Sequence, residues 1–454
     1  MALNAAGETP GMRRVMALAA PIVVSNVTVP LIGVVDTAVM GHMPDAAYIG
    51  AVALGAVVFS FVYWGFGFLR MATTGLTAQA FGRWQAVGDA EAALALRAAL
   101  ARPLALAAAL GLALVILQWP IGAVAFAVLN GSETVEALAS IYFTIRIWGA
   151  PFTLGGYAVL GWLLGQQATR AAVAMQIATN LFNVGLSLLF VLGFGWGVAG
   201  VAAGTLVAEA AGLVFGLWLV RRRLWRTTGN AAIAVPRPVL LDRAALRQLA
   251  GVNFDIFVRT LCLVFAFCWF TDRSAQMGDR LLAANAILLQ FQSFMAYALD
   301  GFAFAAEALV GHAIGARRPQ ALRAGIRAAA GLGFAASAVF AVAYGLFGDL
   351  LVALMTDLPQ VRAATADYRW WMATLPLVSV GSFLLDGIFI GATKAAEMRN
   401  AMLVSVAAFI PAGYLLSAQF GNQGLWAAFA LFMLLRAVTL GLYLPRVLRA
   451  ADRR

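Results

Sequence analysis

Charged residues are scarce in this sequence: they make up 11% of its 454 residues, whereas 63% are hydrophobic. Soluble domains carry roughly 25% charged residues, so this composition excludes an ordinary soluble protein. The hydrophobic residues also gather in runs of about 20 residues, the length that a helix needs to cross a bilayer. The composition therefore indicates an all-α integral membrane protein whose surroundings are the lipid bilayer.

Side chains for metal or catalytic chemistry are also few. The two cysteines, Cys262 and Cys268, and the two histidines, His42 and His312, form no cluster with metal-ligand spacing. The sequence contains no phosphate-binding loop, serine-hydrolase motif or zinc-protease motif. We therefore expect neither an enzyme nor a metal or cofactor site, and any active transport would draw on an ion gradient.

Twelve apolar runs predict twelve transmembrane helices. Arginine and lysine gather in every second loop, above all between Arg221 and Arg247, which predicts that these loops and both termini face the cytoplasm. This placement also accounts for the net charge of +11, so we expect no nucleic-acid partner. The predicted spans are 15–40, 47–70, 92–117, 137–164, 170–193, 197–220, 244–271, 280–311, 321–347, 363–391, 396–418 and 424–446.

The two halves of the chain resemble each other. Each half holds six predicted spans, so both halves begin on the same side of the membrane and the repeat is parallel. The sequence therefore predicts two pseudo-symmetric six-helix bundles, namely an N-lobe over 1–220 and a C-lobe over 244–454, joined by a cytoplasmic linker over 221–243. Three matches support the repeat: LTAQAFG (76–82) with LVGHAIG (309–315) at an offset of 233 residues, GWLLG (161–165) with GIFIG (387–391) at 226, and GVAGVAAG (197–204) with GLWAAFAL (424–431) at 227.

Asp36 is the only carboxylate of the first predicted span, and that span contains no basic residue. An ionisable side chain inside a span is a candidate functional residue because its burial is unfavourable. Desolvation disfavours the charged form of a carboxylate, so Asp36 is predicted to bind and release a coupling proton. Pro21 and Pro30 precede it, and each permits a helix bend. The alternative is a carboxylate at the membrane surface, since His42 follows soon after.

Polar side chains in the fifth and sixth predicted spans are candidates for the surroundings of Asp36. Asn180, Asn183 and Ser187 lie in the fifth span, and Thr205 lies in the sixth. They can hydrogen-bond Asp36 or simply join helices, and both interpretations stay open. Glu209, also in the sixth span, has no partner that the sequence identifies.

The second half carries more buried charge. Asp255 and Arg259 are four residues apart in the seventh span, a spacing that predicts a mutual ion pair on one helix face. Asp300 and Glu307 share a face of the eighth span, and Asp386 lies just before the glycine pair of the tenth. We interpret these residues as a charged network that stabilises the C-lobe, with a role in coupling as the alternative.

Four stretches resemble a known family, multidrug and toxic compound extrusion (MATE). PIVVSNVTVPLIGVVDTAVMGHM (21–43) is similar to the first helix of that family. The resemblance to its DinF-like branch rests on NFDIFVRTL (253–261), AYALDGFAFAAEALVGHAIGAR (296–317) and LLDGIFIGATKAAEMRN (384–400).

The resemblance implies a twelve-helix fold of two six-helix bundles that exports organic cations or other lipophilic compounds against an inward H⁺ or Na⁺ gradient. It places an N-lobe cation site on Asp36, Asn183, Ser187 and Thr205, with Tyr142 as a weaker match. Many relatives have an aspartate where this chain has Ser187, and the missing carboxylate favours H⁺ over Na⁺. The alternatives are a Na⁺-coupled exporter and a flippase of a lipid or lipid-linked precursor. We expect a monomer in a bacterial plasma (inner) membrane.

Overall fold

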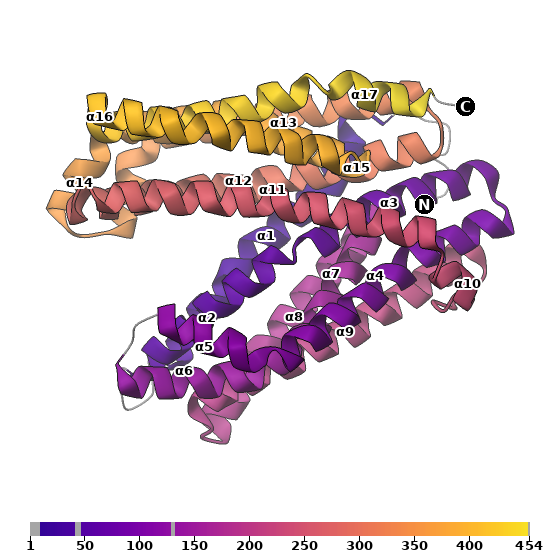
Figure 1. The fold of residues 1–454 in the computed structure, drawn as a ribbon, viewed down its shortest axis with the longest axis horizontal. Helices are drawn as coiled ribbons and strands as arrows, with labels where there is room; N and C mark the ends of the chain where they lie inside the picture. Colours follow the sequence, from indigo (N-terminus) through magenta and orange to yellow (C-terminus); the bar gives the residue numbers. More distant parts are fainter. Residues whose placement is uncertain (1–9, 41–46, 129–131, 453–454) are drawn as a thin grey trace. The chain divides into compact units, whose positions relative to one another are not determined.

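The computed structural model describes residues 10–40, 47–128 and 132–452, apart from the side chains of 27–39. These described residues are almost entirely helical and contain no strand, as the long apolar runs predict. The α-helices are α1 (Met12–Met40), α2 (Ala47–Gly65), α3 (Phe68–Val87), α4 (Ala90–Ile116), α5 (Gln118–Val128), α6 (Glu133–Arg146), α7 (Ala150–Gly165), α8 (Thr169–Leu188), α9 (Gly197–Thr228), α10 (Arg237–Leu240), α11 (Arg243–Ala275), α12 (Asp279–Gly315), α13 (Pro319–Met355), α14 (Pro359–Ala366), α15 (Arg369–Gly391), α16 (Ala395–Gly441) and α17 (Leu444–Leu448) (Figure 1). Two short 3₁₀ segments, η1 (Ile147–Gly149) and η3 (Arg449–Ala451), and a π-helical segment, η2 (Leu189–Gly193), complete them.

Every predicted span falls on helical segments, and the spans 47–70, 363–391 and 424–446 each cross a two-residue turn. Ten helical stretches of the described residues are long and apolar enough to cross a bilayer. One of them, α16, contains a break at Gly421, whose φ of 58° and ψ of −136° are non-helical. Only glycine adopts a positive φ readily, so Gly421 provides the turn between the last two predicted spans. With α1 on the first predicted span, the chain has the expected twelve-span, all-α architecture.

The described residues pack as two compact units. The N-unit comprises Val24–Ala250, and the C-unit comprises the described residues up to Val23 together with those from Gly251 onward. The boundaries of these units thus lie inside α1 and α11, and the lobe bounds of 1–220 and 244–454 stay predictions. The first half of α1 belongs to the C-unit because it packs against α12, where a Cβ added to Gly301 would overlap the side chain of Val23.

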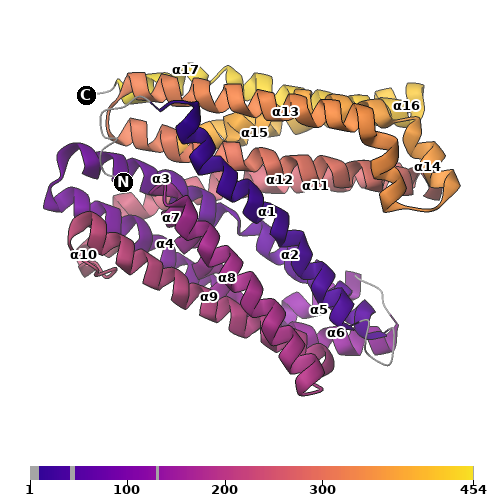
Figure 2. The ribbon, with the colours of Figure 1, turned by 180° about the vertical axis from the view of Figure 1, so that it is seen from behind.

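In the N-unit, α3 and α7 cross with their backbones in contact. A Cβ added to Gly161 would overlap the carbonyl oxygen of Arg70, and one added to Gly165 would lie 2.6 Å from the carbonyl oxygen of Thr74. Small residues allow such an approach, which increases van der Waals contact between helices in a membrane. Figure 2 shows α8 and α9 running side by side in the same unit.

The C-unit repeats the backbone crossing between α12 and α15. Cβ atoms added to Gly387 and Gly391 would overlap the carbonyl oxygens of Ala303 and Glu307. These glycines follow those of α7 by the repeat offset of 226, and their partners follow those of α3 by the offset of 233. The glycine pairs are therefore close-packing surfaces at matching places in the two units.

Buried polar contacts also join α11, α12 and α16 in the C-unit. Asn285 and Asn422 exchange hydrogen bonds of 2.7 and 2.9 Å through their side-chain amides. Asn285 also donates to Ser274 at 2.6 Å and accepts from the Trp426 indole at 2.8 Å. Buried polar groups are expensive unless they are paired, so this network specifies how the three helices pack.

Candidate functional site

Three residues of the predicted N-lobe site come together where α8 packs along α9. The Asn183 side-chain amide donates to the Thr205 hydroxyl at 2.9 Å, and that hydroxyl donates to the Val201 carbonyl at 2.9 Å. Ser187 is completely buried one turn further along α8. Gly204 makes this approach possible, because a Cβ there would lie 3.0 Å from the backbone nitrogen of Ser187.

Other members of the predicted site lie apart from this pair or outside the described side chains. Asn180 is half-buried on α8, about one turn before Asn183. Pro21 lies in α1, two residues before Val23, where the C-unit part of this helix ends. The side chains of Asp36 and Pro30 lie outside the described residues, so the coupling role of Asp36 and the helix bends stay predictions.

Tyr142 belongs to a second polar cluster that the sequence did not reveal. Its hydroxyl accepts a hydrogen bond of 2.6 Å from Arg146, one helical turn along α6. A nitrogen of Arg146 lies 3.6 Å from an oxygen of Glu209 on α9, and the other Glu209 oxygen accepts from Thr153 at 2.5 Å. Glu209 therefore has a cationic partner, which the sequence had not identified. Arg146 lies inside the predicted span 137–164, and an arginine inside a span indicates a buried acidic partner nearby.

Small residues admit the bulky members of this cluster. A Cβ at Gly55 of α2 would overlap the ring of Tyr142, and a Cβ at Gly149 would lie 2.6 Å from the Glu209 carboxylate. The α-helix gives way to the 3₁₀ segment η1 beside that carboxylate, just before Pro151. Proline lacks the N–H of a regular helix and clashes with the preceding turn, which accounts for the change.

The two N-unit clusters are neighbours along α9. Thr205 and Glu209 are four residues apart, so their side chains leave one face of the helix about one turn from each other. The Asn183–Thr205 pair and the Arg146–Glu209 pair thus form one polar column inside the N-unit. Of the described members of this column, the one carboxylate is Glu209.

The charged network of the C-unit exists, but its pairing differs from the prediction. Asp386 of α15 accepts from Arg259 of α11 and, at 2.8 Å, from Arg436 of α16. Asp255 instead pairs with Arg399 at 2.5 Å. The predicted Asp255–Arg259 pair is therefore wrong. Spacing of four residues permits a contact along a helix, but carboxylates on neighbouring helices compete for a long guanidinium side chain.

The remaining predicted residues of the network lie on α12. Asp300 is near enough to Arg436 to interact with it electrostatically. Glu307 is completely buried, at the turn whose carbonyl contacts Gly391. In the part of the chain that the structure describes, no group of three histidine, cysteine, aspartate or glutamate side chains is arranged to hold a metal ion.

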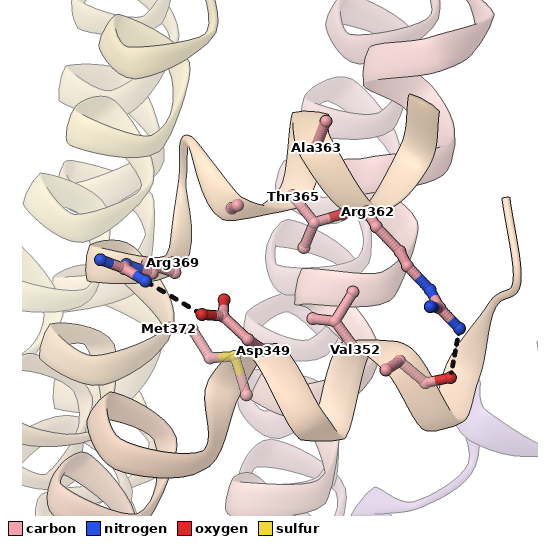
Figure 3. A pocket seen from close by; sticks show the side chains of 9 residues that line it. Asp349, Val352, Arg362, Ala363, Thr365, Arg369 and Met372 are labelled. Atoms are coloured by element: carbon pink, nitrogen blue, oxygen red, sulfur yellow. Dashed lines mark hydrogen bonds and ion pairs between the residues drawn. The ribbon is translucent and has the colours of Figure 1, made fainter. Parts of the chain in front are cut away.

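A separate pocket of about 340 Å³ lies in the C-unit between α13, α14 and α15 (Figure 3). Arg362 donates to the carbonyls of Ala353 and Thr356 at 3.0 and 2.7 Å, and Arg369 donates to Asp349 at 3.1 Å. The first arginine satisfies carbonyls that the end of α13 leaves without helical partners. Arg362 thus caps the end of α13, whereas Arg369 and Asp349 pair with each other, and none of the three belongs to the polar clusters.

Comparison with known proteins places this chain in a family. The sequence model of the MatE family matches residues 21–189 and 256–416, one segment in each half, as an internal repeat predicts. The chain is 41% identical to DNA damage-inducible protein F of Escherichia coli over 93% of its own length and 90% of that protein. It is 26% identical to a probable multidrug resistance protein NorM of Bradyrhizobium diazoefficiens, covering 82% of this chain and 77% of that one.

Solved structures have the same fold. A MATE transporter in its bent conformation matches with a TM-score of 0.84 at 18% identity, over 99% of this chain and 98% of that one. The MATE transporter VcmN of Vibrio cholerae, also in a bent form, matches with a TM-score of 0.83 at 17% identity, over 97% and 98% of the two chains. The family match over most of the sequence and the identity to the Escherichia coli protein lead to one conclusion: this chain belongs to the MatE family of multidrug efflux transporters, which are membrane transporters and not enzymes.

Proposed function

We propose that this protein is a secondary active antiporter that exports organic cations or other lipophilic compounds in exchange for protons. The choice of H⁺ over Na⁺ rests on one observation: Asn183, Ser187 and Thr205 of the predicted N-lobe site carry no charge. Hard cations are held by several oxygen ligands, carboxylates among them. A single carboxylate suffices for a proton, and Asp36 is the residue proposed for this role.

The proposed coupling uses α1 as the moving element. Protonation of Asp36 removes its charge and allows the side chain to sit against apolar neighbours. Pro21 and Pro30 make the helix bendable. Because α1 contributes its first half to the C-unit and its second half to the N-unit, a change in its bend alters the packing of both units. The movement would expel cargo outward, and release of the proton toward the cytoplasm would reset the site.

We further propose that the protein works as a monomer in a bacterial plasma (inner) membrane with both termini in the cytoplasm. The gathering of arginine in alternate loops supports this topology. Accessibility labelling of single cysteines introduced near each terminus and in the 221–243 linker would test it. All three positions should react from the cytoplasmic side, and labelling of either terminus from outside would overturn the topology.

Transport by the purified protein in liposomes tests the proposed coupling. An imposed pH gradient should drive transport of the fluorescent cation ethidium in the direction opposite to the proton flow. An imposed Na⁺ gradient at uniform pH should not drive ethidium transport. Asp36→Asn should fold and reach the membrane but lose transport driven by the pH gradient, because it cannot exchange a proton. Glu91→Gln is the matched control, since Glu91 forms an exposed ion pair with Arg83. Transport driven by Na⁺ alone, or wild-type transport by Asp36→Asn, would overturn the proposal and direct attention to Glu209 or Asp386.

A further inference from the structure

The Arg146 guanidinium lies among three aromatic rings of the N-unit. Its central carbon is 4.9 Å from the ring centre of Phe59, 6.0 Å from that of Tyr63 and 5.7 Å from that of Tyr142. Phe59 and Tyr63 leave one face of α2, four residues apart, and Tyr142 comes from α6. A cation within about 6 Å of a ring centre is attracted by the negative face of the ring. Three rings around one guanidinium therefore form an aromatic cage.

Oxygen atoms complete the surroundings of this guanidinium. The Glu209 carboxylate supplies negative charge at 3.6 Å, and the Tyr142 hydroxyl accepts a hydrogen bond at 2.6 Å. Thr153 holds the carboxylate in place through a 2.5 Å hydrogen bond to its second oxygen. Aromatic faces with a carboxylate and a hydroxyl are the groups that recognise organic cations, because such cations need charge compensation without strong hydration.

Arg146 fills the cage, but its contact with the Glu209 carboxylate is long. The 3.6 Å separation from Glu209 exceeds the 2.8 Å of the Arg436–Asp386 pair in the C-unit and is longer than an ordinary hydrogen bond. The Arg146 Nε is buried and has no hydrogen-bond partner among the described residues. Arginine–carboxylate pairs frequently have two parallel hydrogen bonds, and the Arg146–Glu209 pair has no contact that short. The Arg146 and Glu209 side chains also remain 17% and 15% exposed, so the cage is not sealed.

We propose that Phe59, Tyr63, Tyr142 and Glu209 form a binding site for the charged group of an organic cation, and that the Arg146 guanidinium is its resident occupant. A guanidinium or alkylammonium group of the cargo takes the place of Arg146 in the cage. This proposal rests on the proposed export of organic cations, and it adds the site that receives the cationic group. Thr153 and Gly149 position Glu209 and do not contact the cargo.

The test is to empty the cage and offer it a free guanidinium. Full-length Arg146→Ala is purified in detergent and titrated with millimolar ethylguanidinium, with NaCl adjusted to constant ionic strength. Thermal unfolding is followed by tryptophan fluorescence. The melting temperature of the variant should rise and then saturate, because a ligand at ten times its Kd raises the ratio of folded to unfolded protein about 11-fold. The wild type should respond more weakly at each concentration, since the ligand must first displace its own arginine from the cage.

Two further variants identify the site of any effect. Arg146→Ala with Glu209→Gln should respond to ethylguanidinium far less than Arg146→Ala alone. Arg369→Ala is the control, because Arg369 also lies beside a ring, 5.7 Å from Trp370, and pairs with Asp349. These groups are half-exposed, so removal of Arg369 leaves no enclosed cage and this variant should not respond. Should Arg146→Ala fail to fold, Arg146→Gln replaces it with the same expectation, since its amide can still donate to the Tyr142 hydroxyl. Equal responses of the variant and the wild type, no response of the variant, or an undiminished response of the double variant would overturn the proposal.

Binding of a larger cation links the cage to cargo. Phe59→Leu should weaken equilibrium binding of ethidium to the otherwise wild-type protein about three- to fivefold, the loss expected for one cation–π contact. Phe190→Leu, in the separate aromatic cluster with Phe194 and Trp196, should leave it unchanged. Unchanged binding by Phe59→Leu would show that the cage does not receive cargo. These measurements use no ion gradient, so their failure would leave proton coupling untouched, and a failure of proton coupling would leave them valid.

Discussion

Replacement of Asp386 by asparagine tests whether the charged network of the C-unit stabilises the protein or couples transport. Asparagine has the shape of aspartate and retains an oxygen acceptor, but it carries no charge. Asp386 is the shared acceptor of Arg259 and Arg436, and the three side chains are only 13%, 9% and 4% exposed. Water therefore cannot replace the lost charge, and the substitution leaves buried guanidinium groups without their counter-ion.

The size of the effect follows from what each arginine retains. Arg436 keeps contacts with the Met433 sulfur at 3.2 Å and the Phe432 ring at 5.7 Å, and Asp300 still acts on it electrostatically. Arg259 has no second ion-pair partner among the described residues. One stranded buried charge destabilises a protein by about 3–5 kcal/mol, so we expect Asp386→Asn to lower the free energy of unfolding by about this amount. Adding Arg259→Met should restore part of the loss.

Chemical unfolding in mixed micelles, followed by tryptophan fluorescence, measures this change, and transport in liposomes is measured on the same preparations. Asp255→Asn is the matched comparison, because its partner Arg399 is 31% exposed. Water can solvate that arginine, so we expect a loss of about 1 kcal/mol or less. Wild-type stability of Asp386→Asn combined with loss of transport would refute the structural interpretation and assign Asp386 to the coupling machinery.

Two other predictions concern packing and the N-unit polar column. Gly161→Ala and Gly387→Ala should each destabilise the protein by about 1–3 kcal/mol in the same unfolding assay, because the new methyl group overlaps a backbone carbonyl. Gly185→Ala, with no atom within 4 Å of the added Cβ, should be neutral or stabilising, and equal losses at all three positions would contradict the crossing geometry. Thr205→Val should lower stability by about 1–3 kcal/mol because it leaves the buried Asn183 amide without its acceptor. Thr205→Ser keeps the hydroxyl and should retain most of the stability, and a loss as large as that of valine would show that the hydrogen bond is not the cause.

Several parts of the architecture could be predicted from the sequence because they depend on local composition. The length and hydrophobicity of a run determine whether it can cross a bilayer as a helix, so the predicted spans lie on helices throughout the described chain. The matching segments at 161–165 and 387–391 predicted a repeat, and both lie at close helix crossings because a missing side chain admits another backbone. The sequence likewise marked Asn183 and Thr205 as polar residues of neighbouring spans, and their hydrogen bond joins α8 to α9.

The partners of the buried charges depended on the tertiary structure. Arg259 pairs with Asp386, 127 residues away, and not with Asp255 one turn away. Glu209 meets Arg146 from a different helix and Thr153 from a third. At the repeat offset of 227 residues Glu209 corresponds to Arg436, so the two units carry opposite charges at matching positions, which helical spacing within either half does not predict.

The sequence by itself thus determined which segments enter the membrane, how often the pattern repeats and which side chains are polar in an apolar setting. The tertiary structure decided which polar groups meet. The physical reason is the range of the forces involved. Insertion into lipid depends on each segment alone, whereas an ion pair forms only between atoms within a few ångströms, and packing of distant helices sets those distances.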